Sequence, residues 1–191
     1  MLNALLVLLT FISFTEKETI SVQADVSKST VIWNATKVIG GGHTGTIILS
    51  EAKLDLKGSE LKGGSFTADM TTINSTDLEG DWKAKLDGHL KSDDFFAVDK
   101  FKTATFKITK LKKTATGYDV TGDMTIKGKT VSVTFPATVT ATGDTVTATA
   151  KITLDRTKFD VKYGSNSFFD SLGDKAISDE FTLDVTLVSG K

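Results

Sequence analysis

The sequence predicts an all-β protein, a closed antiparallel barrel of about eight strands with one short flanking helix. Three observations support this fold class. Apolar and polar residues alternate with a period of two over most of the chain after residue 28. Glycine-containing turns separate the alternating runs closely, as in antiparallel hairpins. The longest runs also exceed the ~5–6 residues of an ordinary strand.

Six runs carry the alternation, each with an apolar face and a polar face that is rich in threonine. In the first run, Val31 and Trp33 alternate with Thr30 and Asn34, although Ile32 interrupts the polar face. Threonine is β-branched and suits the exposed surface of a strand. The six predicted strands are 30–36, 65–70, 120–126, 131–139, 145–154 and 181–187.

The connections between these runs are too short for the crossovers that parallel neighbours need. Turn residues occur at Lys57-Gly58, Thr116-Gly117, Lys127-Gly128 and Thr142-Gly143-Asp144. Such one-sided strands in a meander can close on themselves and so remove exposed sheet edges. Pro136, the only proline, falls inside a predicted strand, where we expect a bulge or an unpaired backbone position.

One helix is expected after residue 75. Thr76-Asp77-Leu78-Glu79 has the pattern of a capping box. Leucine or tryptophan then recurs every four residues on one helical face, at positions 78, 82, 86 and 90. Gly88 is expected to end or weaken this helix, which we predict to lie against the mouth of the barrel.

A glycine spacing in the stretch IGGGHTG resembles a dinucleotide-binding loop. Gly40, Gly42 and Gly45 match G-x-G-x-x-G, but that motif needs a helix whose N-terminus faces the phosphates. The following residues, 46–56, read as a strand or hairpin arm. We therefore expect these glycines to allow a sharp bend or a close approach of two backbones.

The interior of the barrel can be interpreted in two ways. Alanine and valine point inward from the two longest runs, at positions 137, 139, 141, 148 and 150, and small residues there would leave a gap. A dry gap of this kind favours an elongated apolar molecule. Phenylalanine and leucine from other strands could equally fill the space, and periodicity alone does not decide between these alternatives.

Residues 1–24 have the layout of a secretory signal peptide. The apolar run 5–14 is shorter than the ~20 residues that span a bilayer as a helix. A polar stretch follows and ends in Val22-Gln23-Ala24, although no Lys or Arg precedes the apolar run. We interpret 1–24 as a leader cleaved near Ala24 and 25–191 as a single exported domain. A retained apolar N-terminal strand is the alternative.

Composition and motifs argue against several other functions. The formal net charge of −1 provides no broad basic surface for nucleic acid, and cysteine is absent. His43 and His89 belong to no metal-ligand spacing. Asp93-Asp94 reads as an ordinary loop pair. No nucleophile motif is present, so we predict no enzyme, no metal and no cofactor, and we expect His43 to be a structural hydrogen-bonding residue.

Three stretches together resemble the YceI family of lipid- or polyisoprenoid-binding proteins. They are HLKSDDFFAVDKFKTATF (89–106), GDMTIKGKTVSVTFPATV (122–139) and LDRTKFDVKYGS with the later SDEFTLDVTL (154–187). Together with STVIWNATKV and GGHTGTI, the resemblance covers about residues 28–188. Two positions depart from the family pattern: Ala97 stands where the family often has Asp, and Lys102 where proline is common.

The resemblance implies a hollow, lipocalin-like barrel that is periplasmic or secreted. It also implies a ligand, namely a polyisoprenoid, an isoprenoid quinone or another long-chain amphiphile, that is held in the lumen for sequestration or transport. Transient contact with a membrane is a further possible partner interaction, and the oligomeric state is left open. The alternative function is a filled barrel that acts as an interaction module through its surface.

Candidate binding residues follow from this resemblance and from the inward faces, although packed core is an equal interpretation for any single one of them. Candidates for the lumen are Trp33, Phe66, Met70, Phe106, Ile108, Met124, Ile126, Val133, Phe135, Val146, Ile152, Phe181 and Leu183. Candidates for the mouth are Trp82, Leu86, Phe95, Phe96, Arg156, Tyr163, Phe168 and Phe169, with Arg156 or Tyr163 placed to meet a polar head group.

Overall fold

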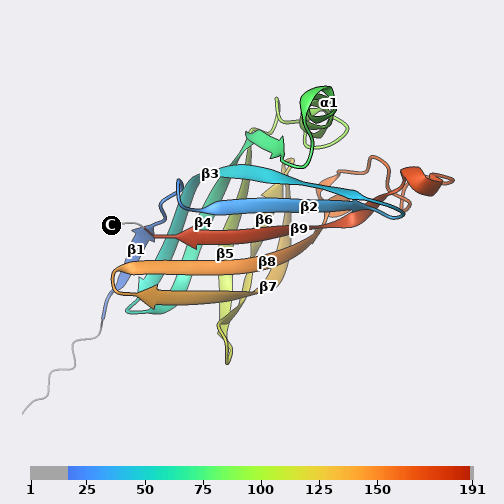
Figure 1. Ribbon diagram of the computed structural model, residues 1–191. Coiled ribbons are helices and arrows are strands. Elements are labelled where there is room, and N and C mark those ends of the chain that lie inside the picture. The colour runs from blue at the N-terminus through green and yellow to red at the C-terminus, as the bar shows by residue number, and fades with distance from the viewer. Residues whose placement is uncertain (1–16, 190–191) are drawn as a thin grey trace, which may run out of the picture.

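The computed structural model describes residues 17–189, which form nine strands, one α-helix and two short 3-10 helices (Figure 1). The strands are β1 (Thr19–Gln23), β2 (Thr30–Lys37), β3 (Gly42–Lys57), β4 (Glu60–Ser75), β5 (Thr103–Lys113), β6 (Tyr118–Ile126), β7 (Lys129–Thr142), β8 (Thr145–Asp155) and β9 (Ile177–Val188). The helices are α1 (Gly80–Lys91), η1 (Arg156–Phe159) and η2 (Gly173–Lys175).

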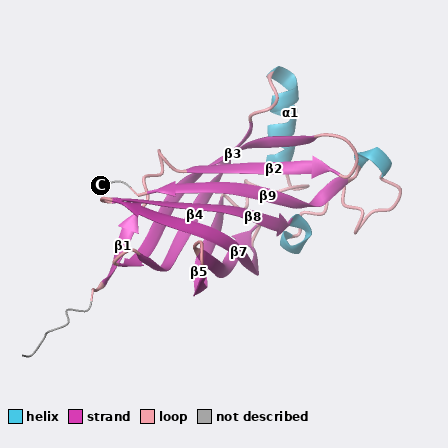
Figure 2. Cartoon of the chain, turned by 60° about the horizontal axis from the view of Figure 1, so that its bottom comes forward, coloured by secondary structure: helices cyan, strands magenta, loops and turns pink. Residues whose placement is uncertain are grey.

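Eight of the strands close into a ring in the order β3-β2-β9-β8-β7-β6-β5-β4, and β4 pairs back onto β3. Every pairing is antiparallel, so the predicted closed barrel is confirmed (Figure 2). Strand β1 lies outside this ring. It pairs with Lys53–Lys57 of β3, beyond the segment Gly42–Thr46 that pairs with β2.

The alternation seen in the sequence sets which side chains face outward. On the outer face of β6 and β7, Thr121 lies opposite Thr134 and Thr125 opposite Thr130, and each pair joins its hydroxyl groups at 2.8 Å. Cross-strand pairs of this kind stabilise a sheet. The threonine-rich polar face therefore has a structural role on the barrel surface.

The two ends of the barrel differ. The helix end carries α1, η1, η2 and the tip of the β2–β3 hairpin, and the turn end carries the β3–β4, β5–β6 and β7–β8 turns (Figure 1). Leu54, Leu56, Leu61 and Ala148 are buried in a cluster that fills the turn end. Tyr118 also packs there, and its hydroxyl accepts a hydrogen bond from the Leu61 N–H at 3.1 Å.

The predicted capping box is wrong. Helix α1 begins at Gly80, and its N-cap residue, Glu79, makes no side-chain capping hydrogen bond. The Thr76 hydroxyl donates to the Thr44 carbonyl, and Asp77 binds His43, so both residues are engaged by β3. Gly88 does not end the helix either, because α1 continues to Lys91.

The expectations for the glycines and for Pro136 are confirmed. A Cβ atom on Gly45 would lie 2.0 Å from the Asn74 carbonyl oxygen, so β3 and β4 could not approach so closely with any other residue there. Pro136 pairs with Asp119 on β6 without a register shift. The β7–β8 ladder begins only at Ala137, which leaves Pro136 unpaired on that side.

The predicted leader falls mostly outside the described residues. Of its 24 positions, Thr19–Gln23 form β1, and Ala24 makes an isolated bridge with Ser189. The Ala24 N–H also donates to the Ala52 carbonyl at 2.8 Å. Within residues 17–189, no helix has both the length and the apolar character needed to cross a membrane.

Candidate ligand cavity

A cavity of about 150 Å³ occupies the helix end of the barrel lumen. Its wall is formed by inward-facing side chains of most barrel strands together with Leu90 of α1 and Phe95 and Phe96 after it. Nearly all of these side chains are apolar. A concave, apolar site of this kind suits an apolar ligand.

The structure places nine of the thirteen predicted lumen residues in the cavity wall. They are Trp33, Phe66, Met70, Phe106, Met124, Ile126, Ile152, Phe181 and Leu183. The other four, Ile108, Val133, Phe135 and Val146, do not line the cavity and pack in the core clusters. Phe135, for example, packs on Phe106 with ring centroids 5.3 Å apart. Contact of the nine with a ligand stays a prediction.

The predicted gap beside the small residues of β7 and β8 is found only in part. Ala137 and Ala150 line a second pocket of about 410 Å³, which also includes Tyr118. Ala137 pairs with Ala150 and Val139 with Ala148, so these small residues are neighbours on adjacent strands. They are absent from the cavity wall. Leucines of β3 and β4 pack in one cluster with Val139 and Ala148, as the second interpretation of the sequence allowed. The cavity lies instead among the aromatic residues of the helix end.

The eight predicted mouth residues divide into three groups. Phe95, Phe96 and Arg156 line the cavity. Leu86 and Tyr163 lie next to wall residues without lining the cavity. The remaining three point into solvent: Trp82 is 71% exposed beside Lys85, and Phe168 and Phe169 are about half exposed.

An aromatic group covers the cavity beside the end of α1. Phe95 lines the cavity, and the rings of His89 and Tyr163 pack against it at centroid distances of 4.8 and 5.5 Å. His89 and Tyr163 also meet edge to face at 4.6 Å, and His89 Nε2 lies 3.3 Å from Asp94 Oδ2. These contacts hold Phe95 in place over the lumen.

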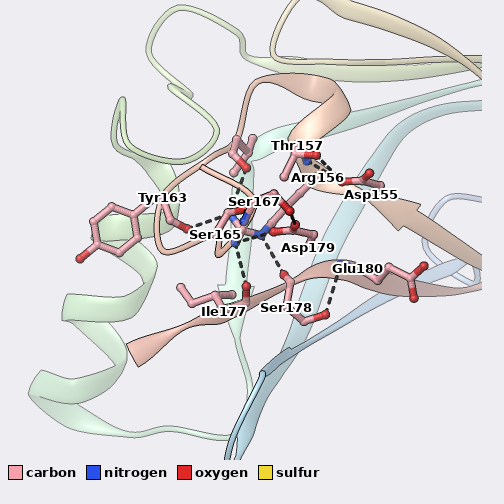
Figure 3. A network of polar contacts seen from close by, with 11 residues as sticks. Asp155, Arg156, Thr157, Tyr163, Ser165, Ser167, Ile177, Ser178, Asp179 and Glu180 are labelled. Carbon is pink, nitrogen blue, oxygen red and sulfur yellow. Dashed lines mark hydrogen bonds and ion pairs between the residues drawn. The ribbon is translucent and has the colours of Figure 1, made fainter. Parts of the chain in front are cut away.

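Arg156 lies buried at the boundary between the cavity and the loop that connects η1 to β9 (Figure 3). All five of its N–H donors have protein acceptors. These are the carbonyls of Val161, Tyr163, Ile177 and Ser178 and the carboxylate of Asp179. In this geometry Arg156 has no donor left for a head group, and it fixes the loop instead.

The same network explains two shifted pKa values. Burial lowers the pKa of Arg156, and the carboxylates of Asp179 and Asp155 oppose this effect. Burial acts to raise the pKa of Asp179, but hydrogen bonds from Ser165 and Ser167 and the charge of Arg156 outweigh it and lower the pKa. The lowered pKa of Asp179 favours its ionised form, which faces the Arg156 guanidinium.

Helix α1 is fastened to the end of β4 by a second polar cluster. Asp87 accepts hydrogen bonds from the Ser75 N–H at 2.8 Å and the Ser75 hydroxyl at 2.7 Å. Lys83 binds the other oxygen of Asp87 at 2.9 Å and also contacts Asn74 and the Ser75 carbonyl. Burial acts to raise the pKa of Asp87, but these hydrogen bonds outweigh it and lower the pKa.

Several residues of the cavity wall were not predicted from the sequence. Ile47 and Leu49 lie in the first half of β3. The alternation of apolar and polar residues in 46–56 is the sequence signal that could have identified them. Leu90 was predicted only as part of the helix face. Val161 is fully buried in a loop, and its local sequence gives no sign of that position.

His43 and His89 each contact one aspartate. His43 Nδ1 lies 2.8 Å from Asp77 Oδ2, which agrees with a structural hydrogen-bonding role. Among the residues that the structure describes, no group of three or more His, Cys, Asp or Glu side chains is placed to hold a metal ion.

Comparison with known proteins decides the family. The model of the YceI-like domain matches residues 22–189. This chain belongs to the YceI family.

Protein YceI of Escherichia coli O17:K52:H18 (strain UMN026) is 41% identical over 73 residues, which are 38% of this chain and 38% of that protein. A UPF0312 protein of Pseudomonas aeruginosa (strain LESB58) is 38% identical over 90 residues, which cover 42% of this chain and 47% of that protein. The match thus spans less than half the length of these YceI relatives.

Solved structures share the YceI fold over most of this chain. Burkholderia cenocepacia BcnA has a TM-score of 0.72 at 24% identity, covering 87% of this chain and 99% of that one. A polyisoprenoid binding domain from Saccharophagus degradans has a TM-score of 0.63 at 12% identity, covering 90% and 98%. At these identities the likeness establishes the fold alone, which is a closed antiparallel β-barrel.

Proposed function

We propose that this YceI-family protein binds a long apolar ligand in the barrel lumen and sequesters or carries it. The ligand class is a polyisoprenoid, an isoprenoid quinone or a related lipid. The observation that carries the proposal is the apolar cavity of about 150 Å³ at the helix end of the barrel. The polyisoprenoid binding domain from Saccharophagus degradans supports the ligand class through its shared fold.

The free energy of transferring a lipid from a membrane into the cavity favours reversible carriage of the lipid over permanent capture. Moving a CH₂ group from water into an apolar site gains about 0.8 kcal/mol. A lipid tail in a membrane is already shielded from water, so transfer into this cavity gains little beyond that environment. Ordering the chain in the cavity has a further cost. Reversible exchange with a membrane is therefore the mode of binding that fits the cavity.

Extraction of bound lipid tests the proposed function. We expect organic extracts of protein purified from its native host to contain an isoprenoid or related lipid in mass spectrometry. Titration of delipidated protein with ubiquinone and polyprenol should show saturable binding. Repeated absence of lipid together with no binding in titration would contradict the proposal and favour the surface interaction module.

Export is part of the same proposal. The apolar run 5–14 and the stretch ending in Ala24 support a leader that is removed near Ala24. Cleavage there removes β1, which lies outside the closed ring, and uncovers Lys53–Lys57 of β3. We expect the intact mass of protein from a periplasmic fraction to match residues 25–191. A mass that includes residues 19–23 would instead show that β1 is retained.

A further inference from the structure

One buried polar atom in the cavity wall has no hydrogen-bond partner among the described residues. Among residues 17–189, Trp33 Nε1 is the buried side-chain nitrogen or oxygen that has no hydrogen-bond partner. Trp33 is 5% exposed and lines the cavity. An unpaired buried N–H costs free energy, whereas phenylalanine would supply an apolar ring at the same position without that cost.

The indole ring packs beside its neighbours on the two adjacent strands. Trp33 lies in β2 opposite Gly45 of β3 and Leu183 of β9. A Cβ atom on Gly45 would lie 2.6 Å from Trp33 Cζ2 and 2.7 Å from Cε2, so the ring edge that bears Nε1 rests over the glycine. The missing side chain of Gly45 therefore leaves room for the ring, and Nε1 is buried there without a partner.

The other polar residues of the wall do not offer a comparable donor. Every N–H of Arg156 is already bound to protein. Thr105 is exposed, and its neighbour Phe106 takes the inward position in the strand. The Ser178 hydroxyl accepts from the Glu180 N–H at 3.2 Å and its side chain is only partly buried, so its O–H is not a buried, unpaired donor.

We propose that the Trp33 indole N–H donates a hydrogen bond to the ligand, which is therefore an amphiphile with a carbonyl-type acceptor and not a pure hydrocarbon. This inference rests on the proposed function. The hydrogen bond requires the buried indole to turn so that Nε1 meets the ligand oxygen, and the bond is strong because the surrounding wall is apolar. The Trp33 N–H then selects isoprenoid ketones or quinones over hydrocarbons of the same length.

The test compares two ligands on three proteins. The ligands are farnesylacetone and the hydrocarbon in which CH₂ replaces its C=O group. The proteins are the wild type, Trp33→Phe, and the matched control Trp82→Phe, whose ring is 71% exposed and outside the cavity wall. Because each variant is measured with both ligands, a change in ring size cancels from the ratio of the two affinities.

We expect Trp33→Phe to lower the preference for the ketone about three- to ten-fold. Trp82→Phe should leave the preference unchanged. An unchanged ratio in Trp33→Phe overturns the inference and leaves the proposed function standing. If neither ligand binds the wild type, both the proposed function and the inference are overturned.

A second measurement needs no substitution at Trp33. The chain has two tryptophans, so Trp82→Phe retains a single indole N–H resonance in ¹H–¹⁵N spectra. We expect farnesylacetone to move this proton downfield, as a new hydrogen bond does, and the hydrocarbon to leave it without that shift. The same response to both ligands overturns the inference even if Trp33→Phe does not fold.

Discussion

At the residue scale, Arg156 determines the conformation of the loop between η1 and β9. Its guanidinium joins the carbonyls of Val161 and Tyr163 on one side of the loop to those of Ile177 and Ser178 on the other. A fixed planar group with five donors can satisfy such a set at once. A buried charge with this many acceptors stabilises one arrangement of the loop.

Replacing Arg156 with methionine tests this role. Arg156→Met leaves buried carbonyls without donors, so we expect the free energy of unfolding in urea to fall by about 3 kcal/mol or more. Lys158→Met is the matched control, because Lys158 is exposed in the same short helix η1. Equal unfolding midpoints for the two variants would show that the Arg156 network does not stabilise the fold.

At the scale of elements, helix α1 is attached by polar contacts as much as by apolar packing. Leu90 is its one buried residue within the described chain. The cluster of Asp87, Lys83 and Ser75 joins the middle of the helix to the last residue of β4. The attachment also places the end of α1, and with it His89 and Phe95, over the cavity.

Acid should weaken this attachment. The pKa of Asp87 lies below its ordinary value of 3.8, so its ionised form stabilises the fold above about pH 4. That contribution is lost as the pH falls through the lowered folded-state pKa. Asp87→Asn should reduce the free energy of unfolding by about 1–3 kcal/mol at pH 7, with a smaller difference from the wild type below pH 4.

Urea unfolding between pH 3 and 7 provides the measurement for Asp87. Asp81→Asn serves as control because Asp81 is an exposed carboxylate in the first turn of the same helix. A difference between wild type and Asp87→Asn that stays constant down to pH 3 would contradict the assignment of this pH dependence to Asp87.

At the scale of the whole molecule, the barrel is hollow at one end and filled at the other. Ala68 lines the cavity and packs against the edge of the turn-end cluster, whereas Ala148 lies within that cluster and does not line the cavity. The two positions therefore have the same side chain but differ in access to the cavity. The cavity that we propose as the ligand site therefore lies toward the helix end, and the turn end provides packed core.

A matched pair of substitutions distinguishes these two ends. Ala148→Phe should lower the free energy of unfolding by about 1–3 kcal/mol, because a packed core has no room for the ring. Ala68→Phe should lower it less, because its ring enters the cavity, and it should weaken ligand binding in the titration described above. Equal destabilisation with unchanged binding would contradict a cavity at the helix end.

Much of the fold was predictable because its determinants are local. A period of two follows from strand geometry, and turn glycines mark where the chain reverses, so the strands and their antiparallel pairing could be predicted. The start of helix α1 could not be predicted, since Thr76 and Asp77 are bound by Thr44 and His43 of β3 instead of capping the helix. Such contacts between distant segments override a local capping pattern.

The sequence by itself determined the family, the closed barrel and which faces of its strands are apolar. Only the tertiary structure decided where the lumen is empty, because an inward alanine leaves space only if the side chains across the barrel are also small or distant. Leu54, Leu56 and Tyr118 pack in the same cluster as Ala148 of β8. The cavity lies where larger side chains, Trp33 and Phe106 among them, line a section that nothing else fills. The volume that side chains occupy inside the barrel depends on residues far apart in the chain, so no local sequence pattern predicts it.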